Sequence, residues 1–279
     1  MPYIVDSQLE ERAVLGLESP AVRLERYAWP DLAALRQASN GLLIIPTGAT
    51  EQHGPHLPIN CDTIIAQALC WRASALTGIP VLPAVPYTVS VGHTAKWPGT
   101  FSLKHETYIA VLREIIAWAV ATGWCKVIIL NSHFGNDASQ RVAVDQLRTE
   151  FIGRLQITAR NSFQLSPAVY AAFIEDAEDL HANKAETDLL LHLTPELVHL
   201  DRNADDPDRT QNTVFSYPVA QTSLNGVTGF PSKASAEDGK RLFESMAEAF
   251  AEILHRARVE QPPLDESHWG SLTQPFHYL

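Results

Sequence analysis

Two runs of consecutive apolar residues constrain the fold of this 279-residue chain more than any other feature. They cover residues 42–46 and 126–130, and apart from the opening Lys126 neither contains a charged residue. A short apolar run of this kind, without polar alternation, is typical of a strand covered on both faces. Helix-like segments lie between the runs. The order of elements therefore predicts βαβ units and a mostly parallel sheet between helical layers.

The remaining patterns extend this α/β interpretation. Helical periodicity covers residues 32–38, 63–76, 102–122, 137–151, 184–193 and 234–258. Further strands are expected at residues 79–85 and 155–159, the former irregular because of two prolines. No repeat or linker divides the chain. We expect a single domain over residues 1–279, with a three-layer α/β/α architecture and a mostly parallel central sheet.

Composition narrows the class of protein. The net charge of −11 argues against nucleic acid or an anionic membrane as a partner. Residues 1–17 are charged and lack the apolar core of a signal peptide, so we expect a cytoplasmic protein. The three cysteines form no CxxC pair and are expected to be reduced thiols. Cys61, beside Asp62, is expected to point away from its neighbour.

Metal-binding residue types cluster directly after the first apolar run. Glu51 and His53 are two positions apart, so on an extended segment both side chains point to one face. Asp62 follows at the expected helix start, from where its carboxylate can bridge two ions. Carboxylate and imidazole without cysteine form the ligand set of catalytic zinc, manganese or iron. Singly, these residues fit a solvated loop pair and a helix N-cap, but the joint pattern favours a metal centre. His56 and His93 are weaker candidates.

Two further groups follow later in the chain. His133 lies just beyond the second apolar run, and Gly135 allows the backbone to approach a ligand closely. Because ligands of open α/β sheets bind beyond the carboxyl ends of the strands, His133 is expected to meet the Glu51 segment. His181 and Glu186 form the third group. Their plainer interpretations are a loop histidine and a first-turn carboxylate favoured by the helix dipole.

Taken in order, these motifs resemble the creatininase (creatinine amidohydrolase) family. The matching segments are residues 46–58 with Asp62, 97–103, 131–136, 181–187, and 226–231 with 234–237. The resemblance runs from about residue 29 to about residue 250, and five motifs in the same order make it specific.

The resemblance implies a three-layer α/β/α domain with two divalent ions per chain, zinc, manganese or iron. Glu51 and His133 would bind one ion, His53 the other, and Asp62 would bridge them. Two residues, His181 and Glu186, match the pair that handles protons around the scissile amide. Residues in the matched motifs are also expected to contact the substrate, namely Trp97, Ser132 and Asn136.

One position departs from the family pattern. In creatininase proper, an acidic residue follows the histidine of the second motif by two positions, where this chain has Gly135. The second ion is then expected to take its ligand from Glu186 or from water, and glycine is expected to leave room beside His133. The departure weakens creatinine as the substrate. It fits better the broader members of the family, which include a formamide deformylase and a peptidase of peptide-cofactor maturation.

The favoured function is a metal-dependent amidohydrolase that cleaves a cyclic amide or formamide bond of a small molecule with metal-activated water. Glu186 would move the proton and His181 would stabilise the oxyanion. The alternatives are a peptidase of peptide-cofactor maturation, or a non-hydrolytic metal-binding lyase, isomerase or sensor on the same fold. Loops at residues 162–179 and 201–225 are expected to shape substrate choice. We also expect a homo-oligomer, a hexamer or another multiple of dimers or trimers, with aromatic anchors at Trp97, Phe101 and Trp124.

Overall fold

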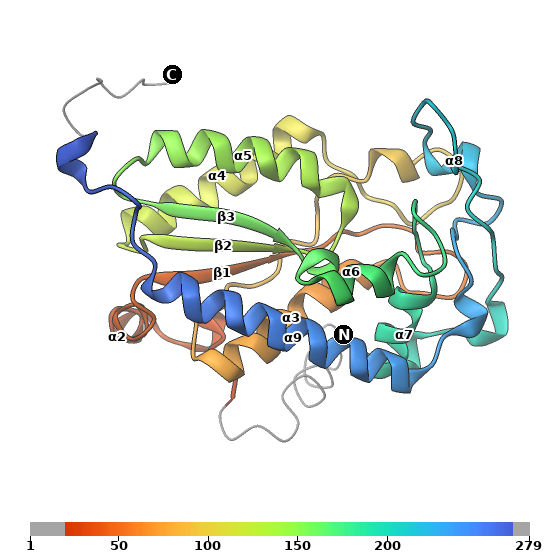
Figure 1. The fold of residues 1–279 in the computed structure, drawn as a ribbon, viewed down its shortest axis with the longest axis horizontal. Coiled ribbons are helices and arrows are strands. Elements are labelled where there is room, and N and C mark those ends of the chain that lie inside the picture. The colour runs from red at the N-terminus through yellow and green to blue at the C-terminus, as the bar shows by residue number, and fades with distance from the viewer. Residues whose placement is uncertain (1–19, 270–279) are drawn as a thin grey trace.

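A three-stranded parallel sheet forms the centre of the computed structural model, which describes residues 20–269. The expectation about residues 1–17 lies outside this range. The strands are β1 (Leu42–Thr47), β2 (Lys126–Asn131) and β3 (Gln156–Asn161), in the order β1-β2-β3. Thr47 pairs with Asn131, and Asn131 pairs with Asn161, so all three carboxyl ends lie at one edge of the sheet (Figure 1).

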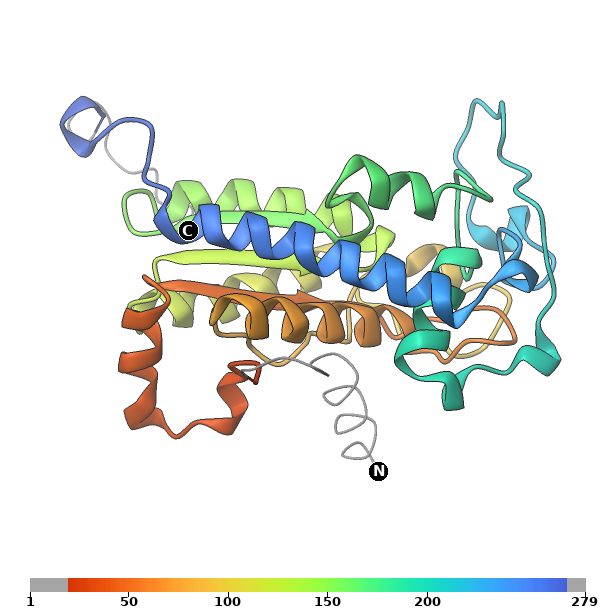
Figure 2. The same ribbon diagram turned by 60° about the horizontal axis from the view of Figure 1, so that its bottom comes forward.

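Helices cover both faces of the sheet and confirm the three-layer prediction (Figures 1 and 2). One layer contains α3 (Cys61–Thr77) and α9 (Ala236–Val259), and the other contains α4 (His105–Ala121) and α5 (Asp137–Glu150). Along β2, Ile128 and Leu130 pack into the α3/α9 core, whereas Val127 and Ile129 pack into the α4/α5 core. Burial on both faces explains why the strand sequence is apolar throughout.

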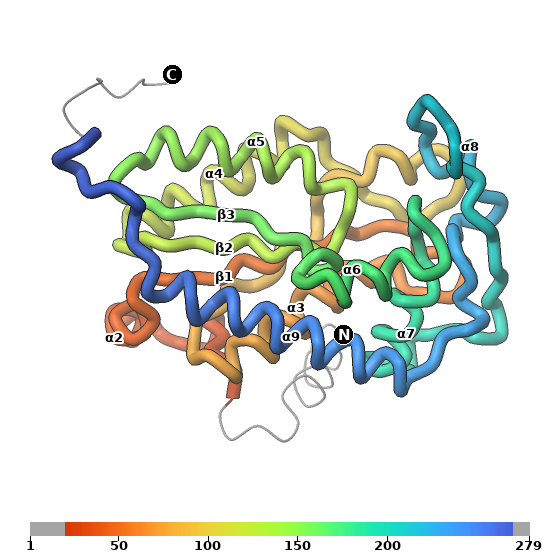
Figure 3. The backbone as a smooth tube through the Cα atoms, in the orientation of Figure 1, coloured from red at the N-terminus to blue at the C-terminus, as the bar shows by residue number. Residues whose placement is uncertain are grey.

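The shorter helices lie at the two ends of the sheet. At its carboxyl end lie α6 (Pro167–Phe173), α7 (Lys184–Leu193) and α8 (Val219–Thr222), whereas α2 (Leu32–Ala38) lies at the opposite end (Figure 3). The carboxyl end therefore carries most of the irregular chain. Among residues 20–269, no helix combines the length and apolarity needed to cross a membrane.

Two expectations about the fold need correction. Residues 79–85, expected as an irregular strand, lie beside β1 but make only isolated parallel bridges, among them Val81 to Ile44 and Val85 to Thr47. The prolines in this segment remove the N–H donors that a ladder requires. Trp124 is no interface anchor, because it is 5% exposed and packs with Leu43. It lies two residues before β2 begins, at the end of the sheet away from the metal-binding motifs.

Candidate metal centre and active site

Four buried side chains meet beyond the carboxyl ends of β1 and β2. Glu51 and His53 lie in the loop after β1, and His133 lies two residues after β2 ends. Asp62 is the second residue of α3, one position inside the helix rather than at its N-cap. Each of the four is at most 5% exposed. The ligand atoms of Glu51, Asp62 and His133 all lie within 4.8 Å of one another, so the structure brings the sequence motifs together as expected.

The Asp62 carboxylate lies between two imidazole rings. Its Oδ1 is 3.1 Å from His53 Nε2, and its Oδ2 is 3.0 Å from His133 Nδ1. Each oxygen therefore faces a different histidine. This is the arrangement expected of a carboxylate that bridges two cations.

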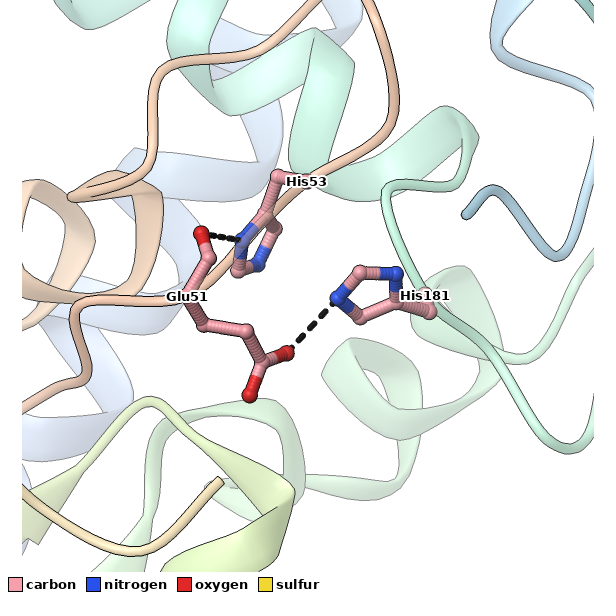
Figure 4. Close-up of side chains that lie close together, drawn as sticks. All are labelled: Glu51, His53 and His181. Atoms are coloured by element: carbon pink, nitrogen blue, oxygen red, sulfur yellow. Dashed lines mark hydrogen bonds and ion pairs between the residues drawn. The ribbon is translucent and has the colours of Figure 1, made fainter. Parts of the chain in front are cut away.

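The hydrogen-bond network assigns the proton positions of both rings. His53 Nδ1 is 3.1 Å from the main-chain oxygen of Glu51 (Figure 4), and His133 Nε2 is 2.8 Å from that of Val89. A carbonyl oxygen only accepts, so these ring nitrogens carry the protons. In the neutral rings, the lone pairs of His53 Nε2 and His133 Nδ1 then point at Asp62. Metal-binding histidines commonly donate their other N–H to a backbone carbonyl in this way.

Electrostatics at the centre favour positive charge between these groups. Burial lowers the pKa of His53, but the Asp62 carboxylate outweighs it and raises the pKa to about 10. Burial likewise lowers the pKa of His133, while Glu51 and Asp62 raise it to about 9. The pKa of Glu51 falls to about 2, because its histidine neighbours outweigh burial. Buried Glu51 Oε2 and Glu186 Oε2 have no hydrogen-bond partner, so the donor set fits divalent cations.

His181 and Glu186 approach the cluster from the start of α7. The Asn183 side chain accepts the N–H of Glu186 at 3.2 Å and thereby caps the helix. His181 Nδ1 is 2.6 Å from the Gly226 oxygen, and its Nε2 is 2.8 Å from Glu51 Oε1 (Figure 4). Both ring nitrogens of His181 therefore face an oxygen that accepts hydrogen bonds. Burial raises the pKa of Glu186, whose Oε1 lies 3.9 Å from His53 Nε2.

Two residues of the site carried weak sequence signals or none. His93 Nδ1 lies 3.2 Å from Glu51 Oε1, so this weaker candidate belongs to the site. The hydroxyl of Ser90 lies 3.2 Å from His133 Nε2. Both residues come from an irregular segment without periodicity, where only the histidine type offered a signal. The other weaker candidate, His56, instead contacts the Thr187 hydroxyl at 2.9 Å.

A cavity of about 340 Å³ opens over the cluster. It is lined by the ligand candidates, by His181 and Glu186, and by apolar side chains that include Val91, Phe134 and Tyr217. Its lining in the described chain contains no lysine and no arginine. The volume lies at the lower end of the range for small-molecule sites. The cluster therefore forms the floor of a small-molecule cavity.

Gly135 does not leave the room that the sequence suggested. A Cβ atom at this position would lie 2.4 Å from the Val89 oxygen and 2.5 Å from His133 Nε2. These are the two atoms of the hydrogen bond that orients the His133 ring. The absence of a side chain at residue 135 therefore lets the Val89 carbonyl reach His133. An acidic side chain at this position does not fit without movement of its neighbours.

The three expected substrate contacts lie outside the cavity lining. The Asn136 amide donates to the Gly48 oxygen at 3.0 Å and accepts the N–H of Val89 at 3.2 Å, which holds two site loops together. Trp97 is half-buried under Lys96, whose Nζ lies 4.6 Å from the ring centre. The Ser132 hydroxyl is buried and has no hydrogen-bond partner. Their contact with substrate stays a prediction.

Cys61 lies closer to the centre than expected. It is fully buried at the start of α3, and its Sγ lies within 4.8 Å of ligand atoms of His53 and Asp62. Because residue 61 is helical rather than extended, the alternation that was expected to turn it away does not apply. Burial raises the pKa of its thiol well above the usual value, which favours the neutral form. A neutral thiol is a poor ligand and nucleophile.

The fold and this constellation define a metal-binding enzyme of the α/β class, and comparison with known proteins gives its family. The creatininase model, described as creatinine amidohydrolase, matches residues 25–254. The chain therefore belongs to the creatininase family, as the motifs suggested.

Three relatives show how far the similarity extends. Creatinine amidohydrolase of Pseudomonas putida is 28% identical over 265 residues, covering 88% of this chain and 99% of the relative. A mycofactocin precursor peptide peptidase of Mycobacterium ulcerans is 35% identical over 224 residues, covering 74% of this chain and 81% of the relative. A crystal structure of creatinine amidohydrolase is 27% identical with a TM-score of 0.75, over 86% of this chain and 99% of that one. Related creatininase structures are described as Zn-Zn and Mn forms.

Proposed function

We propose that this family member is a metal-dependent amidohydrolase that cleaves a cyclic amide or formamide bond of a small molecule. One observation carries the proposal. Asp62 faces His53 Nε2 with one oxygen and His133 Nδ1 with the other, while the second nitrogen of each ring bonds to a main-chain carbonyl. This arrangement serves divalent cations better than it serves a hydrogen-bonded core.

Two ions per chain, zinc, manganese or iron, fit the donor set. Glu51, Asp62 and His133 Nδ1 would hold the first, and Asp62, His53 Nε2 and Glu186 the second. A bound divalent cation would lower the pKa of water and polarise the amide carbonyl. The Zn-Zn and Mn descriptions of related creatininases support zinc and manganese among these.

The protein's own groups supply the proton steps. Glu186 is buried with a raised pKa and has one oxygen without a partner, so it can take a proton from water and return it to the leaving nitrogen. His181 stands 2.8 Å from Glu51 with its other nitrogen fixed by the Gly226 oxygen. Its N–H would stabilise negative charge on the amide oxygen.

The cavity supports a small substrate. Its volume of about 340 Å³ suits a molecule of few heavy atoms, and no lysine or arginine of the described lining offers an ion pair to a peptide carboxylate. A peptidase remains the second candidate, because the M. ulcerans relative with that description is 35% identical. A homo-oligomer, with Phe101 at 61% exposure as one aromatic anchor, is part of the same proposal.

The test is hydrolysis by purified protein loaded with zinc or manganese. Creatinine, other cyclic amides, N-formyl amines and short peptides would be assayed for release of amine or carboxylate. We expect turnover of a cyclic amide or formamide that disappears after chelation and returns with metal. Cleavage of peptides alone would support the second candidate. Metal binding without hydrolysis of any of these compounds would contradict both.

A further inference from the structure

His93 lines the cavity and belongs to the site, but it is neither a metal ligand nor a proton carrier of the proposed mechanism. Its ring lies 4.2 Å from the His181 ring, centre to centre. Its Nδ1 is 3.1 Å from Gln52 Nε2 and 3.2 Å from Glu51 Oε1. No group in residues 20–269 hydrogen-bonds its Nε2. This nitrogen is therefore available to a molecule bound in the cavity.

Gln52 decides which nitrogen of His93 carries the proton. The Gln52 Oε1 atom accepts the N–H of Gly54 at 3.0 Å, so its amide nitrogen must be the atom that faces His93. The amide is also held by close packing, since a Cβ at Gly226 would lie 2.2 Å from Gln52 Oε1. An amide N–H only donates, so His93 Nδ1 accepts and the proton of the neutral ring sits on Nε2.

Glu51 is the competing partner of His93 Nδ1. If Nδ1 carried the proton and donated to Glu51 Oε1, the Gln52 N–H would face another donor. Glu51 Oε1 also lies 2.8 Å from His181 Nε2, which can donate to it. The Nε2–H tautomer gives both the Gln52 amide nitrogen and Glu51 Oε1 a partner, whereas the Nδ1–H tautomer leaves the Gln52 nitrogen facing another donor.

We propose that His93 is a substrate-contacting residue whose Nε2–H donates a hydrogen bond to an oxygen of the substrate, and that Gln52 is the positioning residue that fixes this tautomer. The proposal rests on the proposed function in taking the cavity as the substrate site. The acceptor is an amide oxygen before cleavage or a carboxylate oxygen after it. A histidine fixed as a donor in this way orients the substrate without binding metal itself.

The tautomer can be measured directly and without turnover. Nitrogen-15 NMR of histidine-labelled, zinc-loaded protein, with the His93 signals assigned from the His93→Gln spectrum, reports which nitrogen is protonated. We expect the proton on Nε2 in the native protein and on Nδ1 in Gln52→Glu, whose carboxylate accepts where the amide donated. A native ring protonated on Nδ1 would overturn the proposal. If Gln52→Glu does not fold, the native spectrum still decides.

A matched pair of variants tests the substrate contact. Glutamine places an amide nitrogen near the position of histidine Nε2, whereas asparagine reaches only to that of Nδ1. Formate is the probe, and its dissociation constant is measured by titration at equal zinc content. We expect His93→Gln to stay near the native affinity and His93→Asn to weaken it about tenfold. Equal affinities in all three proteins would overturn the contact. Because formate binding needs no hydrolysis, this failure is distinct from failure of the proposed function.

Discussion

The floor and the roof of the cavity are held in place by opposite kinds of hydrogen bond. In the floor, comprising Glu51, His53, Asp62 and His133, ring N–H groups donate to main-chain oxygens of irregular segments. In the roof, residues 176–230, buried or partly buried carboxylates accept main-chain N–H groups instead. The floor bonds thus fix ligand atoms directly, whereas the carboxylate bonds of the roof fix the path of the chain that carries His181 and Glu186.

The carboxylates of the roof illustrate the second kind. Asp206 Oδ2 accepts the Leu224 N–H at 2.7 Å and the Ser223 hydroxyl at 2.8 Å. Asp176 Oδ2 accepts the N–H groups of Phe230 at 2.7 Å and Lys184 at 3.0 Å. Such contacts tie distant loop segments together with polar bonds, beside the apolar side chains of α7 that pack into the core. The roof can therefore change shape through loop sequence while the floor keeps its chemistry.

The largest effect is expected from Asp62→Asn in the floor. The substitution keeps the shape but replaces a carboxylate that faces both histidines with a much poorer ligand. We expect loss of bound metal and a fall in turnover on the order of 10³-fold. Metal analysis and hydrolysis assays check this. The matched control is Asp206→Asn in the roof, which should keep its metal. Retention of both ions by Asp62→Asn would break the distinction between floor and roof.

Glu186 lies in the roof and faces His53 of the floor, so Glu186→Gln tests the contact between the two regions. Turnover should fall about 10²-fold, because an amide cannot carry the proton. We also expect the ion beside His53 to be lost, since the glycine at position 135 supplies no carboxylate. The metal content of the purified variant separates the two roles. Two ions at full occupancy would leave Glu186 as a proton carrier alone.

Gly135→Ala tests whether the Val89 carbonyl orients the His133 ring in the floor. The new methyl group would overlap the Val89 oxygen and displace the bond that orients His133. We expect metal affinity to drop about 10- to 100-fold, in line with loss of such supporting contacts. Gly92→Ala is the matched control, because Gly92 lines the same cavity and its Cβ would meet no atom within 4 Å. Similar affinities for the two variants, measured by competition with a chelator, would contradict this role.

The smallest effect concerns the roof carboxylate Asp206. Its hydrogen bonds with Arg209, Leu224 and Ser223 outweigh burial and lower its pKa. Its contribution to the free energy of unfolding is therefore complete above the unfolded pKa of about 3.9 and is lost as the pH falls through the lower folded pKa. Asp206→Asn should cost about 1 kcal/mol at neutral pH. Urea unfolding at pH 7 and pH 3 should show this gap narrowing in acid, and a constant gap would disprove the assignment.

The sequence predicted that the floor residues would lie together, because they follow local patterns. The apolar strands before Glu51 and His133 placed both motifs at one edge of a parallel sheet, and the family resemblance added the roles. The helix start near residue 61 was also visible, although Asp62 proved to lie inside the helix. These features depend on residues close together in the chain.

What the sequence could not predict depends on contacts between distant segments. The room at Gly135 is set by the Val89 carbonyl, which arrives from an irregular segment. That segment is positioned by hydrogen bonds such as Leu103 N–H to the Thr88 oxygen at 2.7 Å. No periodicity in the sequence predicts these bonds. Ser90 and the orientation of His93 were hidden for the same reason. Likewise, residues 79–85 have the apolar pattern of a strand, but with two prolines the segment makes only isolated bridges.

The central claim is that the floor holds divalent cations through Asp62. Anomalous diffraction at the zinc edge, from crystals of the zinc-loaded protein, tests it most directly. We predict one peak between Glu51, Asp62 and His133 Nδ1 and a second between Asp62, His53 Nε2 and Glu186. No peak within bonding distance of Asp62, about 2.0–2.2 Å, would contradict the account.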